Sequence, residues 1–255
     1  MPAPENNLKR RLKAGEVTHG LWLCMADAYA AEMAGTAGFD WLLIDGEHAP
    51  NDLRSTMAQL AVLERSGAAP VVRLPDGDPV KVKQVLDIGA QSLLIPMVDS
   101  AEQARMLVQA TRYPPKGFRG VGSSLARASH FAAIPDYLAT ANDQICLILQ
   151  VESVKGMAAL DEILAVDGVD AIFFGPADLA ADMGHIGRAD TPSVREAIYD
   201  GLRRTRAAGK AAGILATGGE FIDAAKAAGA NFVGVGIDVT LFVGALRALA
   251  ARYRG

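Results

Sequence analysis

Ionisable side chains in this sequence gather just after short apolar runs, and the clearest example is Glu152. The stretch "LILQVES" starts with apolar residues and ends in Gln150, Val151 and Glu152. A carboxylate that closes a buried strand costs free energy unless a cation or hydrogen bonds pair with it. The segment "GPADLA" places a second acid, Asp178, after another apolar run. Two such carboxylates are typical of a site for a hard divalent cation that keeps positions open for water or a chelating ligand.

The same two acids have structural alternatives, and their spacing does not decide between them. Glu152 could form an ion pair with a nearby arginine instead of binding a metal ion. Asp178 could serve as the cap of a short helix. Both interpretations stay open at the level of the sequence.

Arg73 lies inside the apolar run "VVRLP", where an arginine must meet an anion. That anion is either a protein carboxylate or a substrate carboxylate held by two parallel hydrogen bonds. His48 follows the run "WLLID" together with Asp45 and Glu47. Neighbouring carboxylates raise the basicity of an imidazole, so His48 is a candidate acid–base group. A solvated surface histidine is the alternative.

These residues need a scaffold that brings distant strand ends together. Apolar runs that alternate with amphipathic segments predict strands over residues 20–24, 41–45, 70–74, 92–96, 145–151, 171–175, 211–215 and 232–236. Continuous apolar strands separated by helices favour a parallel sheet covered on both faces. Units of about 30 residues repeated in this way match a single-domain (β/α)8 TIM barrel over residues 1–255, with a doubly wound open sheet as the alternative. In a barrel, all the side chains above would meet at the C-terminal ends of the strands.

Composition and charge exclude several classes of partner. The net charge is −4 with no basic block, which argues against nucleic acid. No apolar run reaches transmembrane length and the N-terminus lacks a signal core, so we expect a cytoplasmic protein without a membrane partner. The only cysteines, Cys24 and Cys146, are far apart, which favours a reducing compartment and argues against a zinc motif or a disulfide.

Several chemistries find little support in the sequence. A barrel enzyme that forms a Schiff base needs a lysine in the mouth of the barrel, which is the end formed by the C-terminal ends of the strands. Lys155 falls on a helix, however, and Lys210 precedes a strand. The stretch "GVGSSL" lacks the third glycine of a dinucleotide fingerprint. "TGGE" and "GVGID" follow the last two strands, where barrels often bind phosphate, so a phosphorylated substrate stays open. The long loop over 113–131 carries Arg119 and Arg127 and is expected to be functional rather than a surface excursion.

At these residues the sequence resembles the HpcH/HpaI family of metal-dependent, class II pyruvate aldolases. The resemblance covers essentially the whole chain through "WLLIDGEHAP", "VVRLP", "GFRGVGSSLARAS", "LQVES" and "FFGPADLAADMG". Members that act on 4-hydroxy-2-oxoheptanedioate and 2-dehydro-3-deoxyglucarate look the most similar. The resemblance implies a (β/α)8 barrel, a divalent ion (Mg²⁺, Mn²⁺ or Co²⁺) and a homohexamer built as a dimer of trimers. It implies reversible cleavage of 4-hydroxy-2-oxo acids to pyruvate and an aldehyde through a metal-stabilised enolate.

The resemblance also implies roles for individual residues. Glu152 and Asp178 would be the metal ligands. Arg73 would hold the keto oxygen and stabilise the enolate, and His48 with Asp45 would belong to the acid–base apparatus. Substrate contacts would come from Gln150, Gly175, Pro176, Ala177 and Leu215.

Two features point to an assembly of several copies. Asp87 in "VLDIG" matches an acid that reaches a neighbouring subunit's site, and an acid at a helix end is disfavoured by the macrodipole. A solvated surface acid is the alternative for Asp87. The last helix, "VTLFVGALRALAARYRG", is apolar on more than one stripe, whereas a surface helix of a monomer shows one. We therefore expect it to pack on a neighbouring subunit.

Three further functions compete with the aldolase. Two of them keep the metal and the enolate but change the reaction to oxaloacetate decarboxylation or to a lyase that uses phosphoenolpyruvate. The third is a non-catalytic barrel that binds a keto acid as a sensor. The set of polar residues expected at the barrel mouth argues against the sensor.

Overall fold

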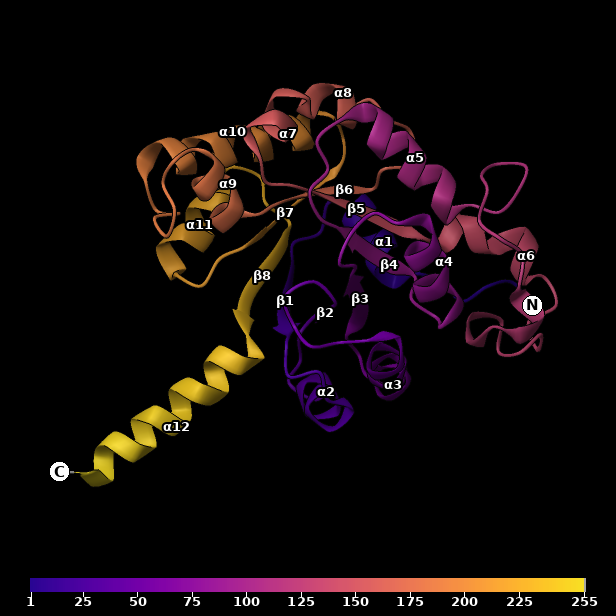
Figure 1. The fold of residues 1–255 in the computed structure, drawn as a ribbon, viewed down its shortest axis with the longest axis horizontal. Coiled ribbons are helices and arrows are strands. Elements are labelled where there is room, and N and C mark those ends of the chain that lie inside the picture. Colours follow the sequence, from indigo (N-terminus) through magenta and orange to yellow (C-terminus); the bar gives the residue numbers. More distant parts are fainter. Residues whose placement is uncertain (255) are drawn as a thin grey trace.

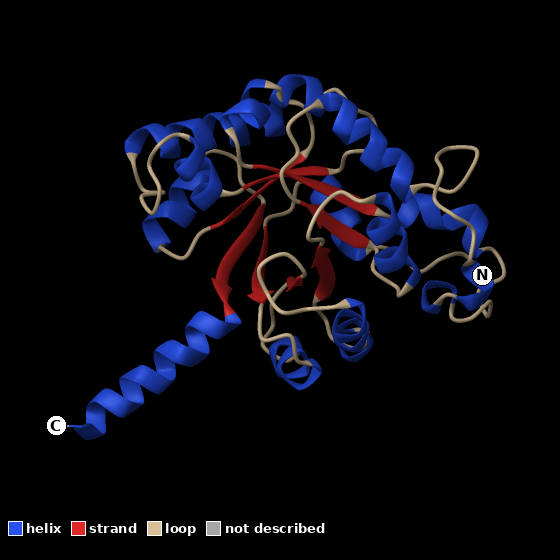
Figure 2. Cartoon of the chain, in the orientation of Figure 1, coloured by secondary structure: helices blue, strands red, loops and turns tan. Residues whose placement is uncertain are grey.

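The computed structural model describes residues 1–254, and they form a closed barrel of eight parallel strands (Figures 1 and 2). The strands are β1 (Thr18–Leu23), β2 (Trp41–Asp45), β3 (Ala69–Arg73), β4 (Ser92–Ile95), β5 (Cys146–Val151), β6 (Ala171–Phe174), β7 (Ala211–Leu215) and β8 (Phe232–Ile237). Each strand pairs with the next along the chain, and β8 closes the sheet onto β1. The predicted TIM barrel is confirmed, and the open sheet is wrong.

Helices follow the strands as the sequence predicts. They are α1 (Asn7–Lys13), α2 (Ala28–Gly35), α3 (Leu53–Leu63), α4 (Pro79–Asp87), α5 (Ala101–Thr111), α6 (Tyr137–Thr140), α7 (Val154–Ala158), α8 (Leu160–Leu164), α9 (Pro176–Asp182), α10 (Pro192–Ala207), α11 (Gly219–Ala227) and α12 (Asp238–Arg254). Short 3-10 turns lie at η1 (Ser123–Leu125), η2 (Arg127–Ser129) and η3 (Ala141–Gln144).

Helix α3 illustrates how local sequence sets an element's bounds. Asp52 is its N-cap and accepts a hydrogen bond from the Ser55 amide at 2.7 Å, while the Ser55 hydroxyl accepts one from the Asp52 amide. This capping box fixes the start of the helix. The helix ends at Leu63, whose carbonyl accepts from the Ser66 hydroxyl at 2.8 Å.

The barrel interior is filled by aromatic side chains. Trp22, Trp41, Phe173 and Phe232 contact one another, with the rings of Trp41 and Phe232 only 4.1 Å apart. Small residues make room for them: a Cβ atom on Gly20 would lie 2.0 Å from the Trp41 ring. The lumen is therefore a packed core that holds the strand ends in fixed positions.

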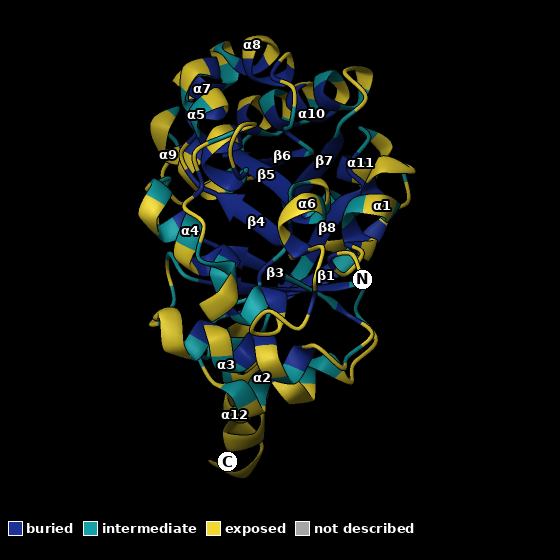
Figure 3. Cartoon of the chain, turned by 90° about the vertical axis from the view of Figure 1, so that its right-hand side faces the viewer, coloured by how far each residue is buried: buried dark blue, intermediate teal, exposed yellow. Residues whose placement is uncertain are grey.

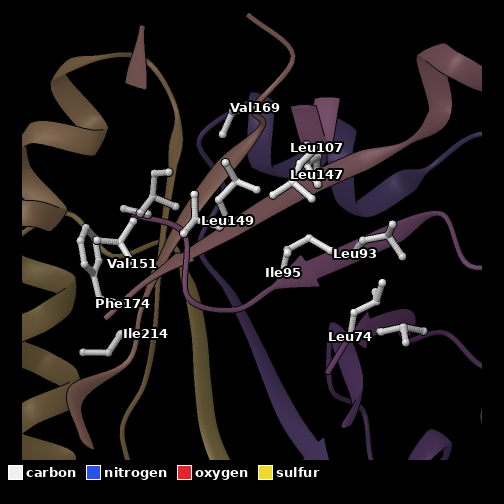
Figure 4. Close-up of a cluster of buried hydrophobic side chains, with 14 of the residues drawn as sticks. Leu74, Leu93, Ile95, Leu107, Leu147, Leu149, Val151, Val169, Phe174 and Ile214 are labelled. Carbon is white, nitrogen blue, oxygen red and sulfur yellow. The ribbon is translucent and has the colours of Figure 1, made fainter. Parts of the chain in front are cut away.

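A second core lies between the strands and the surrounding helices. On β5, Leu147, Leu149 and Val151 point outward into it and meet Ile95 of β4 and Phe174 of β6 (Figure 4). Burial on both faces explains why the strands read as unbroken apolar runs instead of alternating. These two cores fix the position of each strand end, and therefore the position of the polar residues that follow it at the mouth.

Helix α12 differs from the other helices because it leaves the barrel. It projects away from the strands (Figure 1), and none of its residues, 238–254, is buried (Figure 3). Leu241, Phe242, Leu246 and Leu249 are each about half exposed, at 59%, 55%, 49% and 53%. Among residues 1–254, no helix has both the length and the apolar character needed to cross a bilayer.

Candidate active site

Arg73 and Asp45 form the centre of the polar cluster at the C-terminal ends of the strands. They end the paired strands β3 and β2 and face each other in register. Arg73 Nε and Nη2 donate to the two carboxylate oxygens of Asp45 at 2.8 and 2.6 Å. Both residues are buried. Burial alone would raise the pKa of Asp45, but the bonds from Arg73 outweigh it and the pKa is lowered.

Glu47 is a second partner of Arg73 that was not among the expected site residues. Its Oε2 lies 2.8 Å from Arg73 Nη1 and 3.7 Å from His48 Nε2. Burial raises the pKa of Glu47 despite the arginine. The imidazole of His48 is 65% exposed and faces Glu47, while only its backbone amide reaches Asp45. His48 is therefore coupled to the cluster through Glu47, which its position two residues after Asp45 could have suggested.

Glu152 lies just beyond the end of β5 and is 2% exposed. It accepts hydrogen bonds from the Met97 amide at 3.1 Å and from the Gln150 side chain, and neither donor carries a charge. Burial, with the nearby acids Asp178 and Glu47, raises the pKa of Glu152 to about 7. No ion pair within residues 1–254 neutralises this carboxylate, so the ion-pair alternative is not supported.

Gly175 holds the chain close to Glu152 after β6. A Cβ atom at this position would lie 2.2 Å from Glu152 Oε2, so only glycine fits. Helix α9 starts at Pro176, and Asp178 occupies its first turn. Asp178 is therefore not the cap of this helix, because the N-cap is Gly175, and its side chain is exposed. The need for a cation therefore comes mainly from Glu152.

The donor set at the mouth fits a divalent cation. Glu152 and the nearby Asp178 carry hard carboxylate oxygens of the kind such an ion prefers, and Gln150 Oε1 is buried without a hydrogen-bond partner among residues 1–254. Within the same residues there is no group of three or more His, Cys, Asp or Glu side chains that could hold a metal ion. An ion held by two carboxylates would keep positions open for a chelating ligand, as the sequence suggested.

The apolar wall of the mouth comes from β1 and β7. Leu215 ends β7 and packs on the interior cluster that includes Trp22, whose ring lies 5.8 Å from the Arg73 guanidinium carbon. Cys24 follows β1, and its Sγ lies 3.7 Å from Asp45 Oδ2. Burial, followed by the charges of Asp45 and Asp238, raises the pKa of Cys24 to about 12, so the thiol stays neutral.

Asp87 and the long loop lie elsewhere in this chain. Asp87 ends α4, which places it at the N-terminal ends of the strands, and its carboxylate accepts from Arg119 at 2.6 Å. The loop over 113–131 joins α5 to β5 and belongs to the same end, where Arg127 donates to the Ile88 carbonyl. Neither is brought together with the mouth of its own barrel.

The lysines lie where the sequence placed them. Lys155 is exposed on α7, and the Lys210 ammonium donates to the carbonyls of Val166 and Val169, which precede β6. Neither lysine is among the side chains that contact the cluster of Arg73 and Asp45.

Comparison with known proteins identifies the relatives of this arrangement. The family model for "HpcH/HpaI aldolase/citrate lyase" matches residues 18–245. The chain belongs to the HpcH/HpaI aldolase/citrate lyase family. The resemblance and the prediction of a carbon–carbon lyase are thereby confirmed.

Several members of the HpcH/HpaI family are similar over nearly their whole length. A hydroxypyruvate/pyruvate aldolase from Roseovarius nubinhibens is 61% identical over 254 residues, which cover 100% of this chain and 99% of the relative. A 4-hydroxy-2-oxo-heptane-1,7-dioate aldolase from Escherichia coli is 51% identical, covering 98% and 95%. A crystal structure of a family protein from Burkholderia cenocepacia superposes with a TM-score of 0.94 at 40% identity, covering 98% and 100%.

Proposed function

We propose that this chain is a metal-dependent class II aldolase that cleaves 4-hydroxy-2-oxo acids reversibly to pyruvate and an aldehyde. The observation that carries the proposal is the buried Glu152 carboxylate, which forms no ion pair within residues 1–254. A buried charge of this kind is costly unless a ligand of opposite charge completes it. The names and high identity of the aldolase relatives support the same reaction.

Glu152 and Asp178 would hold the divalent ion, with Mg²⁺, Mn²⁺ and Co²⁺ as candidates. When bound there, the ion would supply Lewis-acid polarisation of a 2-oxo acid. Gln150 would support this site by holding the Glu152 carboxylate through its side-chain amide. The glycine at 175 would keep the backbone of Pro176 and Ala177 near the keto acid's carboxylate.

Arg73 would stabilise the enolate oxygen that develops as the carbon–carbon bond breaks. A guanidinium group has about five N–H donors, and the protein carboxylates occupy three of its nitrogens here. N–H groups on both terminal nitrogens thus stay available for a substrate oxygen. Because Asp45 and Glu47 fix the guanidinium plane, these donors are oriented before the reaction begins.

Proton transfer would involve His48, which lies against Glu47 and is open to solvent. A base must remove the proton of the C4 hydroxyl group, and an acid must protonate the enolate carbon. An exposed imidazole beside the reacting cluster can exchange protons with water. Asp45 would act on this group through Arg73 and through the His48 backbone amide.

The nucleophile is proposed to be pyruvate or hydroxypyruvate, because relatives at up to 61% identity carry both in their name. Leu215 would line the aldehyde side of the pocket. The test is to supply Mg²⁺ with pyruvate or hydroxypyruvate and a panel of aldehydes, and to follow the aldol product. Keto-acid binding without product from any aldehyde would contradict the aldolase and favour the sensor. Release of CO₂ from oxaloacetate at a higher kcat/KM would favour the decarboxylase.

The assembly is proposed to be a homohexamer in which α12 packs on a neighbouring subunit. The half-exposed apolar side chains of α12 support this, because a helix of a monomer would bury one face. Asp87, which lies far from its own mouth, would reach a neighbour's site. A stable monomer in light scattering at micromolar concentration would contradict both parts.

A further inference from the structure

The loop after β1 adopts a backbone conformation that needs support. Cys24, Met25 and Ala26 connect β1 to Asp27, which caps α2. Ala26 has φ +55°, in the left-handed region that residues other than glycine rarely adopt. Such a conformation is strained and persists only where its surroundings hold it.

The support for this loop comes from the residue after β8, the strand that pairs with β1 and closes the barrel. Asp238 is the first residue of α12 and directly follows β8. One carboxylate oxygen accepts from the Cys24 amide at 2.8 Å and the other from the Met25 amide at 3.2 Å. The first oxygen also accepts from the Val239 amide at 2.6 Å, at the start of α12. Hydrogen bonds to an ionised acceptor are stronger than neutral ones, so this carboxylate is a firm anchor for the loop.

The anchored loop contacts the polar cluster of the mouth. The Cys24 thiol lies 3.7 Å from Asp45 Oδ2, the same oxygen that accepts from Arg73 Nη2. Asp238 therefore reaches the Asp45–Arg73 pair through one residue, although its own carboxylate contacts neither. No other ionised side chain within residues 1–254 bonds to the amides of Cys24 and Met25.

We propose that Asp238 is a positioning residue that fixes the β1–α2 loop against the Asp45–Arg73 pair. Its carboxylate holds Cys24 beside Asp45, and this contact keeps the Arg73 fork in the orientation that meets the substrate. The proposal deepens the aldolase function and rests on it, since it takes the barrel mouth as the reacting site. Because the same carboxylate also accepts from the Val239 amide in the first turn of α12, the start of that helix and the geometry of the mouth share one anchor.

Alkylation of Cys24 by iodoacetamide tests the loop without any substrate. In the native protein the neutral thiol, whose pKa is about 12, should react slowly at pH 8. Asp238→Ala removes one of the charges that raise this pKa and frees the loop, so alkylation of Cys24 should accelerate by about fivefold or more. Cys146 is fully buried and serves as an internal check on folding. An unchanged rate at Cys24 would overturn the proposal.

Kinetics tests the catalytic part. Asp238→Ala should lower kcat by about 10- to 100-fold with a small change in KM, because a misplaced group loses transition-state contacts. Asp238→Asn keeps one acceptor oxygen but loses the charge and one of the two hydrogen bonds to the loop, so its kcat should lie between the native and Asp238→Ala values. Asp52→Ala removes a helix cap at the same end of the barrel and should leave kcat and Cys24 unchanged. Accelerated alkylation with native kcat would overturn the positioning role.

Two outcomes are separated in advance. If Cys146 also reacts in Asp238→Ala, this variant has unfolded, and Asp238→Asn is used in its place. Alkylation of Cys24 that is about threefold faster in Asp238→Asn supports the anchor, and alkylation at the native rate overturns it. If the native protein performs no aldol reaction, the alkylation arm still supports or overturns the anchored loop. Failure of the aldolase is thus distinct from failure of the anchor.

Discussion

The two ends of the barrel treat buried charge differently. One end is formed by the N-terminal ends of the strands and is called here the base of the barrel. There, the Lys9 ammonium donates to the Ile145 carbonyl at 2.6 Å and lies 3.3 Å from Asp170. Asp170 in turn accepts from the Leu147 amide, and the amide group of Asn6 donates to the Ser92 hydroxyl. Here the ammonium of Lys9 and the carboxylate of Asp170 neutralise each other.

At the mouth, acids outnumber bases. Asp45, Glu47, Glu152 and Asp178 converge near a single arginine, Arg73. Arg73 forms ion pairs with Asp45 and Glu47, whereas Glu152 forms none within residues 1–254. Charges are therefore paired at the N-terminal ends of the strands, whereas at the mouth the acids exceed the available cations. The difference indicates that the base serves stability and that the mouth is completed by a ligand.

The largest effect should follow from removing the uncompensated charge. Glu152→Gln should lower aldol activity below about one-thousandth of the native rate and abolish its response to divalent ions. The metal-free protein should keep its melting temperature or gain stability, because a buried charge is replaced by a neutral amide. Calorimetry with Mn²⁺ and melting curves measure the two effects. Asp178→Asn should also lose the response to divalent ions.

Asp161→Asn is the matched control, since Asp161 is an exposed acid that pairs with Arg204 on the outer helices. Its activity and Mn²⁺ binding should stay native. Native Mn²⁺ binding in Glu152→Gln would break the distinction between the two ends of the barrel.

Arg73 should give the next largest effect. Arg73→Ala should reduce kcat by about 100-fold or more, because one preorganised donor facing the developing oxyanion is lost. It also leaves Asp45 buried without its partner, so stability should fall. Arg73→Lys should restore little activity, since an ammonium on a flexible stem does not reproduce the planar fork. Steady-state kinetics of the two variants, with melting curves alongside, measure this. Full activity in Arg73→Lys would remove the planar fork from the mechanism.

A substitution at the N-terminal ends of the strands should lower stability and leave activity unchanged. Lys9→Ala removes the cation beside Asp170 and should lower the free energy of unfolding by about 1–3 kcal/mol. Its kcat/KM should stay within about twofold of the native value, because the mouth is untouched. Urea unfolding and kinetics on the same preparation measure both. A large loss of kcat/KM without a loss of stability would contradict the division of roles.

Much of the fold could be predicted from the sequence because the apolar runs are long and unbroken. Burial on both faces leaves few other uses for a segment such as "ICLILQV". The strand ends then placed Asp45, Arg73 and Glu152 at one mouth. The partners of each charge could not be predicted, because they depend on side-chain geometry across strands. The sequence thus left open whether Arg73 meets protein or substrate, and it did not reveal that Glu47 joins the pair.

The remaining discrepancies have similar causes. Asp178 was a possible helix cap, but Gly175 is the N-cap of α9 and Asp178 lies in its first turn with an exposed side chain. The loop over 113–131 was expected to be functional; it leads from α5 toward β5 and so lies at the N-terminal ends of the strands, and its function stays a prediction. The anchoring role of Asp238 depends on β8 closing onto β1, a contact between the two ends of the sequence.

Exchange of the methyl protons of pyruvate with deuterated water, followed by NMR without any aldehyde, tests the central claim most directly. Enolisation is half of the aldol reaction, so the account predicts exchange that requires a divalent ion, stops with a chelator and resumes on adding Mg²⁺ or Mn²⁺. Glu152→Gln should show none. Borohydride added with pyruvate should not inactivate the enzyme. Exchange that resists the chelator, together with borohydride trapping at Lys155, would contradict the account and replace the metal site with a Schiff base.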